Sequence, residues 1–408
     1  MSVPKLRFKE FDGAWISTNI QGLVDQNILD KPMDGNHGEI HPTSADYVEN
    51  GIPFVMATDV FDGNVYLDKS KKITKEQADT LRKGFSIEGD ILLTHKATIG
   101  NVAKVPKLDT PYIMLTPQVT YYRVIDYEKL VPDFIKSSFE SKKFQNELIA
   151  LCTGATRLYI GISEQRKLPF SYPSKSEQTK IASFLSAVDE KISQLTQKHE
   201  LLSQYKQGMM QKLFSQQIRF KADDGSEFDE WETDLIRDVF TNKSKNYNPQ
   251  IGKNLPCIEL EHLSQNTGKI LGTIESCEQQ STKNLFEKNS VLFGKLRPYL
   301  RKFAKPQFKG VCSSEIWVLT GLKISNEYLF QYIQSEHFSE LTNIQSGSKM
   351  PRADWNVISE AEIEYPCIAE QTKIANFLSS IDQKIEVVAQ QIEQAKQWKK
   401  GLLQQMFV

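Results

Sequence analysis

Residues 177–214 read EQTKIASFLSAVDEKISQLTQKHELLSQYKQGMMQKLF, and residues 370–407 read EQTKIANFLSSIDQKIEVVAQQIEQAKQWKKGLLQQMF. The two segments align without a gap, 193 residues apart. A near duplicate of this length predicts two units of similar size, each ending in one long helix. Two units are too few for a solenoid, so the repeat predicts a pseudo-two-fold protein that would suit a ligand with two halves.

Both segments carry apolar residues at alternating steps of three and four. These positions are Leu185, Val188, Ile192 and Leu195 in the first segment, and Leu378, Ile381, Ile385 and Val388 in the second. Such heptads are typical of a coiled-coil seam, and neither stripe can be buried alone. The second unit leaves the end of the first helix and enters the start of the second. Because the ends of a compact domain often lie close together, we expect an antiparallel helix pair.

Polar residues interrupt the predicted seam. Lys206 and Lys399 occupy the same position of the two segments, and His199 lies one heptad before Lys206. We expect the lysine stems to pack in the seam while their ammonium groups reach solvent. A role in fixing the helix register is the alternative.

The repeat extends to both ends of each unit. LRF at 6–8 opens the first unit as IRF at 218–220 opens the second, and Tyr-Pro at 172–173 precedes the first helix as it does at 365–366. Between these ends the two units share little beyond a strand-like rhythm broken by Gly, Pro, Asn and Asp. The sequence therefore predicts one scaffold used twice with different surfaces.

Short apolar runs such as IPFVMA at 52–57 and EIWVLTG at 315–321 predict strands in both units. We expect an α+β protein with two mixed, mostly β domains separated by two long helices that form an antiparallel coiled coil. The expected boundaries are 1–173 and 218–366 for the β domains, and 174–217 and 367–408 for the helical regions.

Composition fits an ordinary globular chain of 408 residues. Fifty basic and 51 acidic residues give a net charge of −1, which neither indicates nor excludes a nucleic-acid partner, because charge can segregate by face. Five cysteines without a CxxC pair indicate reduced thiols and a cytoplasmic protein. No stretch approaches 18 apolar residues, so we expect no membrane association.

Motifs of enzymes are absent from the sequence. It contains no GxxxxGK[ST], HExxH or GxSxG motif, no GxGxxG after a strand, and no Asn-Pro-Pro-aromatic tetrapeptide. His37 and His41 have the spacing of metal ligands, but no third ligand stands near them, which favours surface histidines over a metal site. We therefore expect no catalytic residue, cofactor or metal in this chain.

Two loops in each unit are candidate DNA contacts, because Arg and Lys can bind phosphates or read guanine edges, and Asn or Gln can read adenine. The first loop follows an apolar strand, and the second follows a short helix. The candidate residues are His95, Lys96, Thr98, Arg157 and Tyr159 in the first unit, and Lys295, Arg297, Tyr299, Arg301, Lys349 and Arg352 in the second. A solvated charged hairpin and a purely structural turn are the alternatives.

These features resemble the specificity subunit of type I restriction-modification systems over essentially the full length of the chain. The resemblance is carried by EQTKIASFLSAVDEKI and EQTKIANFLSSIDQKI, each after Tyr-Pro, and by FGKLRPYLRKFAK at 293–305 followed by SSE at 313–315. It matches the helices and the 295–305 loop well. THKATIGN at 94–101 departs from the basic loop, so the DNA-reading residues of the first unit are less well defined.

The resemblance implies a DNA-recognition role without catalysis. Each β domain would be a target-recognition domain that reads one half of an interrupted double-stranded DNA sequence from the major groove. The helices would set the unread gap and dock two modification subunits, which would carry S-adenosylmethionine and methylate DNA. Restriction subunits, with ATP and Mg, would add translocation and cleavage in defence against phage.

Two other classes of function remain as alternatives. A cytosolic protein-interaction scaffold would use the same two β heads on a coiled-coil spacer to bind proteins. A self-sufficient methyltransferase or nuclease would need a motif that this sequence lacks.

Overall fold

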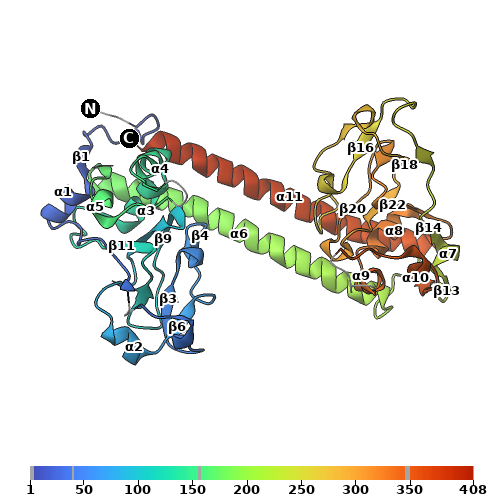
Figure 1. Ribbon diagram of the computed structural model, residues 1–408, viewed down its shortest axis with the longest axis horizontal. Helices are drawn as coiled ribbons and strands as arrows, with labels where there is room; N and C mark the ends of the chain where they lie inside the picture. The colour runs from blue at the N-terminus through green and yellow to red at the C-terminus, as the bar shows by residue number, and fades with distance from the viewer. Residues whose placement is uncertain (1–3, 39–40, 155–157, 345–349, 408) are drawn as a thin grey trace. The chain divides into compact units, whose positions relative to one another are not determined.

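The computed structural model describes residues 4–38, 41–154, 158–344 and 350–407. The chain divides into two compact units, Met1–Thr196 with Gln390–Val408 and Gln197–Ala389. Two long helices, α6 (Lys175–Phe214) and α11 (Ile368–Met406), each give one half to each unit (Figure 1). The prediction of two β-rich domains with two long helices is confirmed. Within the described ranges, no helix has the length and apolar character needed to cross a membrane.

In its described residues, the first unit contains two four-stranded sheets and two two-stranded ones. The strand orders are β2 (Met33–Asp34), β11 (Val119–Tyr122), β8 (Ile91–Lys96), β9 (Thr98–Lys104); then β6 (Lys71–Ile73), β3 (Ile52–Val55), β10 (Ile113–Leu115), β7 (Phe85–Ser86); and β1 (Ile16–Asn19) with β12 (Pro169–Tyr172). A small hairpin joins β4 (Val60–Phe61) and β5 (Asn64–Val65). The helices are α1 (Ile20–Asp25), α2 (Lys75–Thr80), α3 (Pro132–Glu140), α4 (Lys142–Ala150) and α5 (Ile162–Gln165).

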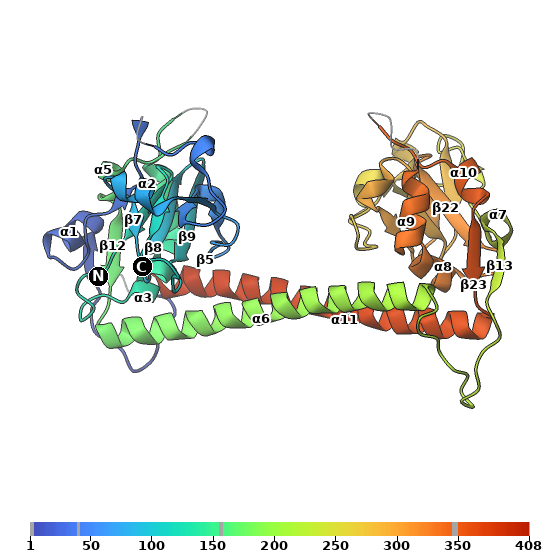
Figure 2. The ribbon, with the colours of Figure 1, turned by 90° about the horizontal axis from the view of Figure 1, so that it is seen from below.

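The second unit repeats this plan. Its strand orders are β14 (Phe240–Thr241), β22 (Ile316–Gly321), β19 (Val291–Gly294), β20 (Phe303–Ala304); then β15 (Asn246–Tyr247), β18 (Lys283–Phe286), β21 (Gly310–Cys312), β16 (Pro256–Ile258), β17 (Ile274–Glu275); and β13 (Glu232–Leu235) with β23 (Glu362–Tyr365). The helices are α7 (Ile236–Val239), α8 (Asn326–Tyr332), α9 (Glu336–Asn343) and α10 (Trp355–Ser359). Both units appear with their labels in Figure 2.

The duplication persists through the segments whose sequences diverge. Each unit pairs one strand with a parallel neighbour, β3 with β10 in the first and β16 with β21 in the second, while the other ladders are antiparallel. Each unit also places two short helices in tandem, with a serine cap on the second. Ser141 accepts a hydrogen bond from the Phe144 amide, and Ser335 does the same for Phe338. The middles therefore differ in surface residues and share one fold.

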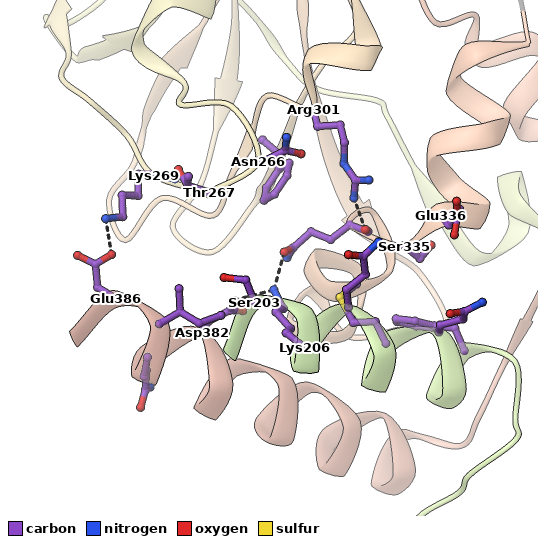
Figure 3. A pocket seen from close by; sticks show the side chains of 18 of the residues that line it. Ser203, Lys206, Asn266, Thr267, Lys269, Arg301, Ser335, Glu336, Asp382 and Glu386 are labelled. Atoms are coloured by element: carbon purple, nitrogen blue, oxygen red, sulfur yellow. Dashed lines mark hydrogen bonds and ion pairs between the residues drawn. The ribbon is translucent and has the colours of Figure 1, made fainter. Parts of the chain in front are cut away.

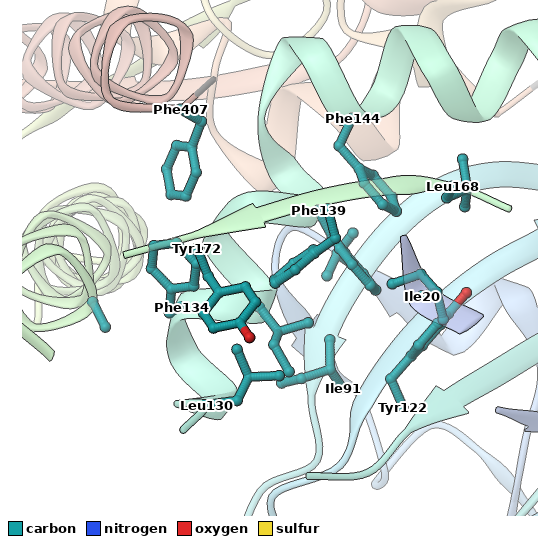
Figure 4. Close-up of a cluster of buried hydrophobic side chains, with 14 of the residues drawn as sticks. Ile20, Ile91, Tyr122, Leu130, Phe134, Phe139, Phe144, Leu168, Tyr172 and Phe407 are labelled. Carbon is teal, nitrogen blue, oxygen red and sulfur yellow. The ribbon is translucent and has the colours of Figure 1, made fainter. Parts of the chain in front are cut away.

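In each unit the first half of one long helix packs with the second half of the other. In the first unit, Ile181 and Leu185 of α6 share a core with Leu402 and Met406 of α11. In the second unit, Leu213, near the end of α6, shares a core with residues from the first half of α11. The helices are therefore antiparallel in both units. The core of the first unit continues from the long helices into the β domain. Phe407 lies beside Phe134 of α3, with ring centroids 5.4 Å apart (Figure 4).

The prediction that the seam lysines reach solvent is wrong. Lys206 Nζ lies 2.6 Å from Asp382 Oδ1, and Lys399 Nζ lies 2.7 Å from Asp189 Oδ1. Both lysine side chains are largely buried, because each meets an aspartate of the facing helix. Burial lowers the pKa of Lys206, and the nearby Asp382 carboxylate opposes that shift. The two ion pairs occupy the same place in the repeat, so each unit has a lysine–aspartate contact between the two long helices.

The EQ that begins each repeat ties the long helix to the start of its unit. Arg7 donates to both carboxylate oxygens of Glu177 at 2.7 Å, and Arg219 donates to those of Glu370 at 3.2 and 2.8 Å. Both glutamates are buried. Bidentate pairing of this kind fixes direction as well as distance, so the helix cannot rotate relative to the segment that opens the unit.

The glutamines that follow satisfy backbone groups of the domain. Gln178 accepts from the Val131 amide at 3.1 Å and donates to the carbonyls of Lys129 and Pro173 at 2.9 Å. Gln371 makes the equivalent set. The side chain therefore joins the helix to the turn before α3 or α8 and to the end of the preceding strand.

We predict that Gln178→Leu lowers the free energy of unfolding by about 2–4 kcal/mol, because it leaves buried backbone groups without partners. Gln371→Leu should cost a similar amount. Thermal unfolding by circular dichroism measures both. Gln194→Leu, at an exposed position of α6 where the glutamine donates to Glu190, is the control. Equal melting temperatures for Gln178→Leu and Gln194→Leu would contradict the proposed tie.

Candidate nucleic-acid interface

In the second unit, the loop after β19 is joined to the segment before α10 by backbone hydrogen bonds. The Ala353 amide donates to the Lys295 carbonyl at 2.9 Å, and the Arg297 amide donates to the Pro351 carbonyl at 2.8 Å. Leu296 and Arg352 form the bridge between them. The two loops that the sequence singled out therefore form one surface element.

The first unit builds the same element. The Ile160 amide donates to the His95 carbonyl at 3.1 Å, and Lys96 forms a bridge with Tyr159. The structure thus brings His95 and Lys96 together with Tyr159, and Lys295 and Arg297 together with Arg352. We call each joined pair of loops a composite loop, 95–98 with 158–160 in the first unit and 295–301 with 350–353 in the second.

Matching ladders assign equivalent positions in the two composite loops. The amides of His95 and Lys295 each donate at 2.9 Å to the residue before the neighbouring strand, Gln118 and Glu315. His95 is therefore equivalent to Lys295, and Tyr159 is equivalent to Arg352 through the bridges.

The two corners of the composite loops are also equivalent. Ala97 and Arg297 both have left-handed backbone, with φ of 69° and 52°. Sequence reasoning missed Ala97, because an alanine carries no chemical signal and only strand register reveals its place.

The cations of the 295–305 loop divide into two groups. Lys302 donates to the Leu260 carbonyl at 2.6 Å, and Lys305 pairs with Glu327 at 3.4 Å. Lys295 and Arg297 have no side-chain partner within the described ranges. Among the described residues, the corner of the second unit therefore has two cations without a side-chain partner, and the ring of Tyr299 in the same loop is exposed. Arg352 is exposed too, and its guanidinium pairs with Glu315 at 3.1 Å.

Arg301 faces the interior of the second unit. It lies in a cavity of about 1460 Å³ between the β body and the helix residues of this unit, and it donates to the Gln334 carbonyl (Figure 3). Burial lowers the pKa of its guanidinium, and Glu336 opposes the shift. The role of Arg301 as a DNA contact stays a prediction, and in this structure its guanidinium is partly buried and donates to Gln334 inside the cavity.

His95 is also buried. Its Nδ1 lies 3.0 Å from the Ile160 carbonyl, and its Nε2 lies 4.0 Å from Asp34 Oδ2 with no hydrogen-bond partner in the described part of the chain. Burial lowers the pKa of the imidazole, and the Asp34 carboxylate opposes the shift. His95 therefore joins the two halves of the composite loop from within, while Lys96, Thr98 and Tyr159 are exposed.

Two predicted contacts, Arg157 and Lys349, lie outside the described residues. His37 binds Asp34 at 2.9 Å, and His41 contacts the Asn36 carbonyl. Across the described ranges, no group of three His, Cys, Asp or Glu residues could hold a metal ion. The candidate interface consists of polar and cationic side chains on two composite loops.

Comparisons with known proteins agree with this architecture. The family model described as "Type I restriction modification DNA specificity domain" matches residues 33–204 and 229–397. The type I restriction enzyme MjaVIII specificity subunit of Methanocaldococcus jannaschii is 24% identical over 94% of this chain and 88% of its own length. The EcoDI specificity subunit of Escherichia coli is 26% identical over 59% of this chain and 61% of its own length.

Solved structures share the fold. The S subunit of a type I restriction-modification system from M. genitalium superposes with a TM-score of 0.60 at 17% identity, covering 100% of this chain and 99% of its own. A chain from a study of complex assembly in the type I R-M system gives a TM-score of 0.56 at 14% identity over 97% of both chains. Since the family model covers both halves of the sequence, this chain belongs to the type I restriction-modification DNA specificity subunits, the non-catalytic components of those enzymes.

Proposed function

We propose that each unit reads one half of a bipartite double-stranded DNA target through its composite loop. The observation that carries this proposal is that one backbone frame occurs twice while the residues at equivalent corners differ, as Ala97 and Arg297 do. Equivalent frames would enter the major groove alike, and different side chains would select different bases.

Membership in the family supports a proposal for the partners. Two modification subunits dock on the helical regions 174–217 and 367–408 and supply S-adenosylmethionine and the methyltransferase site. Restriction subunits supply the ATP- and Mg-dependent steps. This chain selects the DNA target and binds no cofactor of its own. The complex acts in the cytoplasm.

A protein-interaction scaffold is distinguished from this function by the effect of salt. Neutralising phosphates releases counterions, so the affinity of the assembled complex for DNA should fall log-linearly with salt concentration. A scaffold that binds proteins through its β heads would show no such dependence on DNA.

The proposed division of labour is tested by exchanging segments. Residues 24–66 and 87–161 are replaced by those of another family member, and DNA methylation is sequenced in a host that also expresses the modification subunit. One half of the methylated target should change. The same exchange over residues 240–354 should change the other half. A change in both halves from either exchange would contradict independent recognition.

The helices are expected to set the spacing of the target. Inserting four residues after both Leu195 and Val388 adds about 6 Å at 1.5 Å per residue, close to two base pairs at about 3.4 Å each. Because four residues are near one helical turn, the seam is largely kept. Methylome sequencing should show a longer gap with unchanged half-sites. An insertion of the same length after Gly225, in an exposed turn, should leave the gap unchanged. An unchanged gap in the helix variant would show that the helices do not set the spacing between the half-sites.

Arg297→Ala should weaken DNA binding by about 1–3 kcal/mol and relax one position of the second unit's half-site if Arg297 reads a base. Ala97 holds the equivalent backbone conformation, so alanine fits this corner. The affinity of the assembled complex, measured for each single-base change in the target, reports both effects. Lys309→Ala, which removes an exposed cation paired with Glu287, is the control. If Arg297→Ala keeps full affinity and selectivity, the side chain does not contact DNA and the loop is a solvated hairpin.

A further inference from the structure

A path of polar contacts in the second unit runs from the helix seam to the composite loop. Lys206 pairs with Asp382 and donates to Gln334 Oε1 at 2.8 Å. Gln334 lies just after α8, and its carbonyl accepts a hydrogen bond from Arg301, the residue that ends the loop (Figure 3). The seam lysine and the loop arginine therefore meet at one residue.

The first unit makes the same connection with different residues. Lys399 pairs with Asp189 and with Glu140, the last residue of α3, both at 2.7 Å. The neighbouring carbonyl, that of Phe139, accepts from Gln145 Nε2 at 2.6 Å. The same Nε2 donates at 2.9 Å to the carbonyl of Gly100 in β9, the strand that leaves the loop.

Close packing supports a fixed geometry at this point of the first unit. Gly100 has φ of +91°, and a Cβ there would lie 2.2 Å from the Gln145 side-chain oxygen. The amide group of Gln145 is therefore held directly against the backbone of the return strand.

The carboxyl ends of α3 and α8 are equivalent in the two units. At each of them, the seam lysine and the segment that follows the corner of the composite loop are held close together. The connecting residue is a cation in one unit and a neutral amide in the other. In this structure both donors bind backbone carbonyls, and a mechanical connection of this kind needs only a hydrogen-bond donor of the right reach.

We propose that Arg301 and Gln145 are positioning residues, which fix the composite loops relative to the helix seam and thereby set the accuracy of base reading. This inference rests on the proposed function. Base discrimination requires hydrogen bonds of about 2.7–3.2 Å, so a loop that shifts by an ångström loses selectivity before it loses attraction to phosphates.

The test uses the full chain assembled with its modification subunits. Arg301→Met removes both donor and charge at similar length, and Gln145→Met removes the donor without any change of charge. Binding is measured against the target and its single-base variants over a range of salt concentrations. Each variant should lower discrimination in its own half-site by about tenfold, leave the other half-site unchanged, and keep the wild-type salt slope.

Two further variants separate positioning from other roles. Arg301→Lys keeps a donor and the charge and should restore most of the selectivity. Lys305→Met removes one charge from the same run of residues and should keep selectivity. The melting temperature of each variant shows whether it is folded, and Gln145→Met tests the proposal in the first unit if Arg301→Met does not fold.

Other outcomes would overturn the inference. A salt slope reduced by about one in Arg301→Met, with selectivity kept, would make Arg301 a phosphate anchor. Wild-type selectivity in both Arg301→Met and Gln145→Met would make the path a packing feature only. If Arg297→Ala also has no effect, the proposed function of the loop fails; if Arg297→Ala acts and these variants do not, the positioning role alone fails.

Discussion

The buried glutamate and glutamine at the start of each long helix are the contacts on which the rest of the structure depends. A carboxylate without water is stable only when it is paired and hydrogen-bonded, and Glu177 and Glu370 meet this condition through Arg7 and Arg219. Removing one partner of such a pair typically costs about 3–5 kcal/mol, because the other charge stays buried. The glutamines then bind backbone that leads into α3 and α8. Within each unit, these contacts attach the long helix to the domain that carries the composite loop.

Much of this fold could be predicted from the sequence because its largest elements are local and repeated. A heptad stripe needs only its own residues to be recognised, and the duplicate gives the second helix without further information. The sheets are different. Many strands have two to four residues, and their order depends on partners far away in the chain, as in the parallel pairing of β3 with β10. The matching ends of the two units predicted a shared scaffold, but the strand pairing inside the two middles could not be predicted, because backbone hydrogen bonds do not depend on residue type.

The candidate interface shows the same limit at the scale of single side chains. Sequence identifies a basic run at 295–305, but Lys302, Lys305 and Arg301 are committed to groups that lie 22–42 residues away. Such partners determine which cation is available, and they become known only when the sheet is assembled. The seam lysines were misjudged for a related reason. Their partners are aspartates on the facing helix, and a pattern read along one helix does not contain them.

The two composite loops differ in charge more than in shape. The corner of the second unit carries Lys295 and Arg297, where the first has His95 and Ala97, and burial favours the neutral form of His95. Lys96 is thus the cation that the first corner presents among these residues. Nonspecific attraction to phosphate grows with the number of cations, whereas base selection depends on where donors and acceptors are held. Under the proposed function, a frame held by backbone ladders would let the two units differ in their attraction to DNA while placing their base-reading side chains alike. Under the proposed function, a net charge near zero is then compatible with DNA recognition, because accuracy comes from placement and the remaining attraction can come from partner subunits.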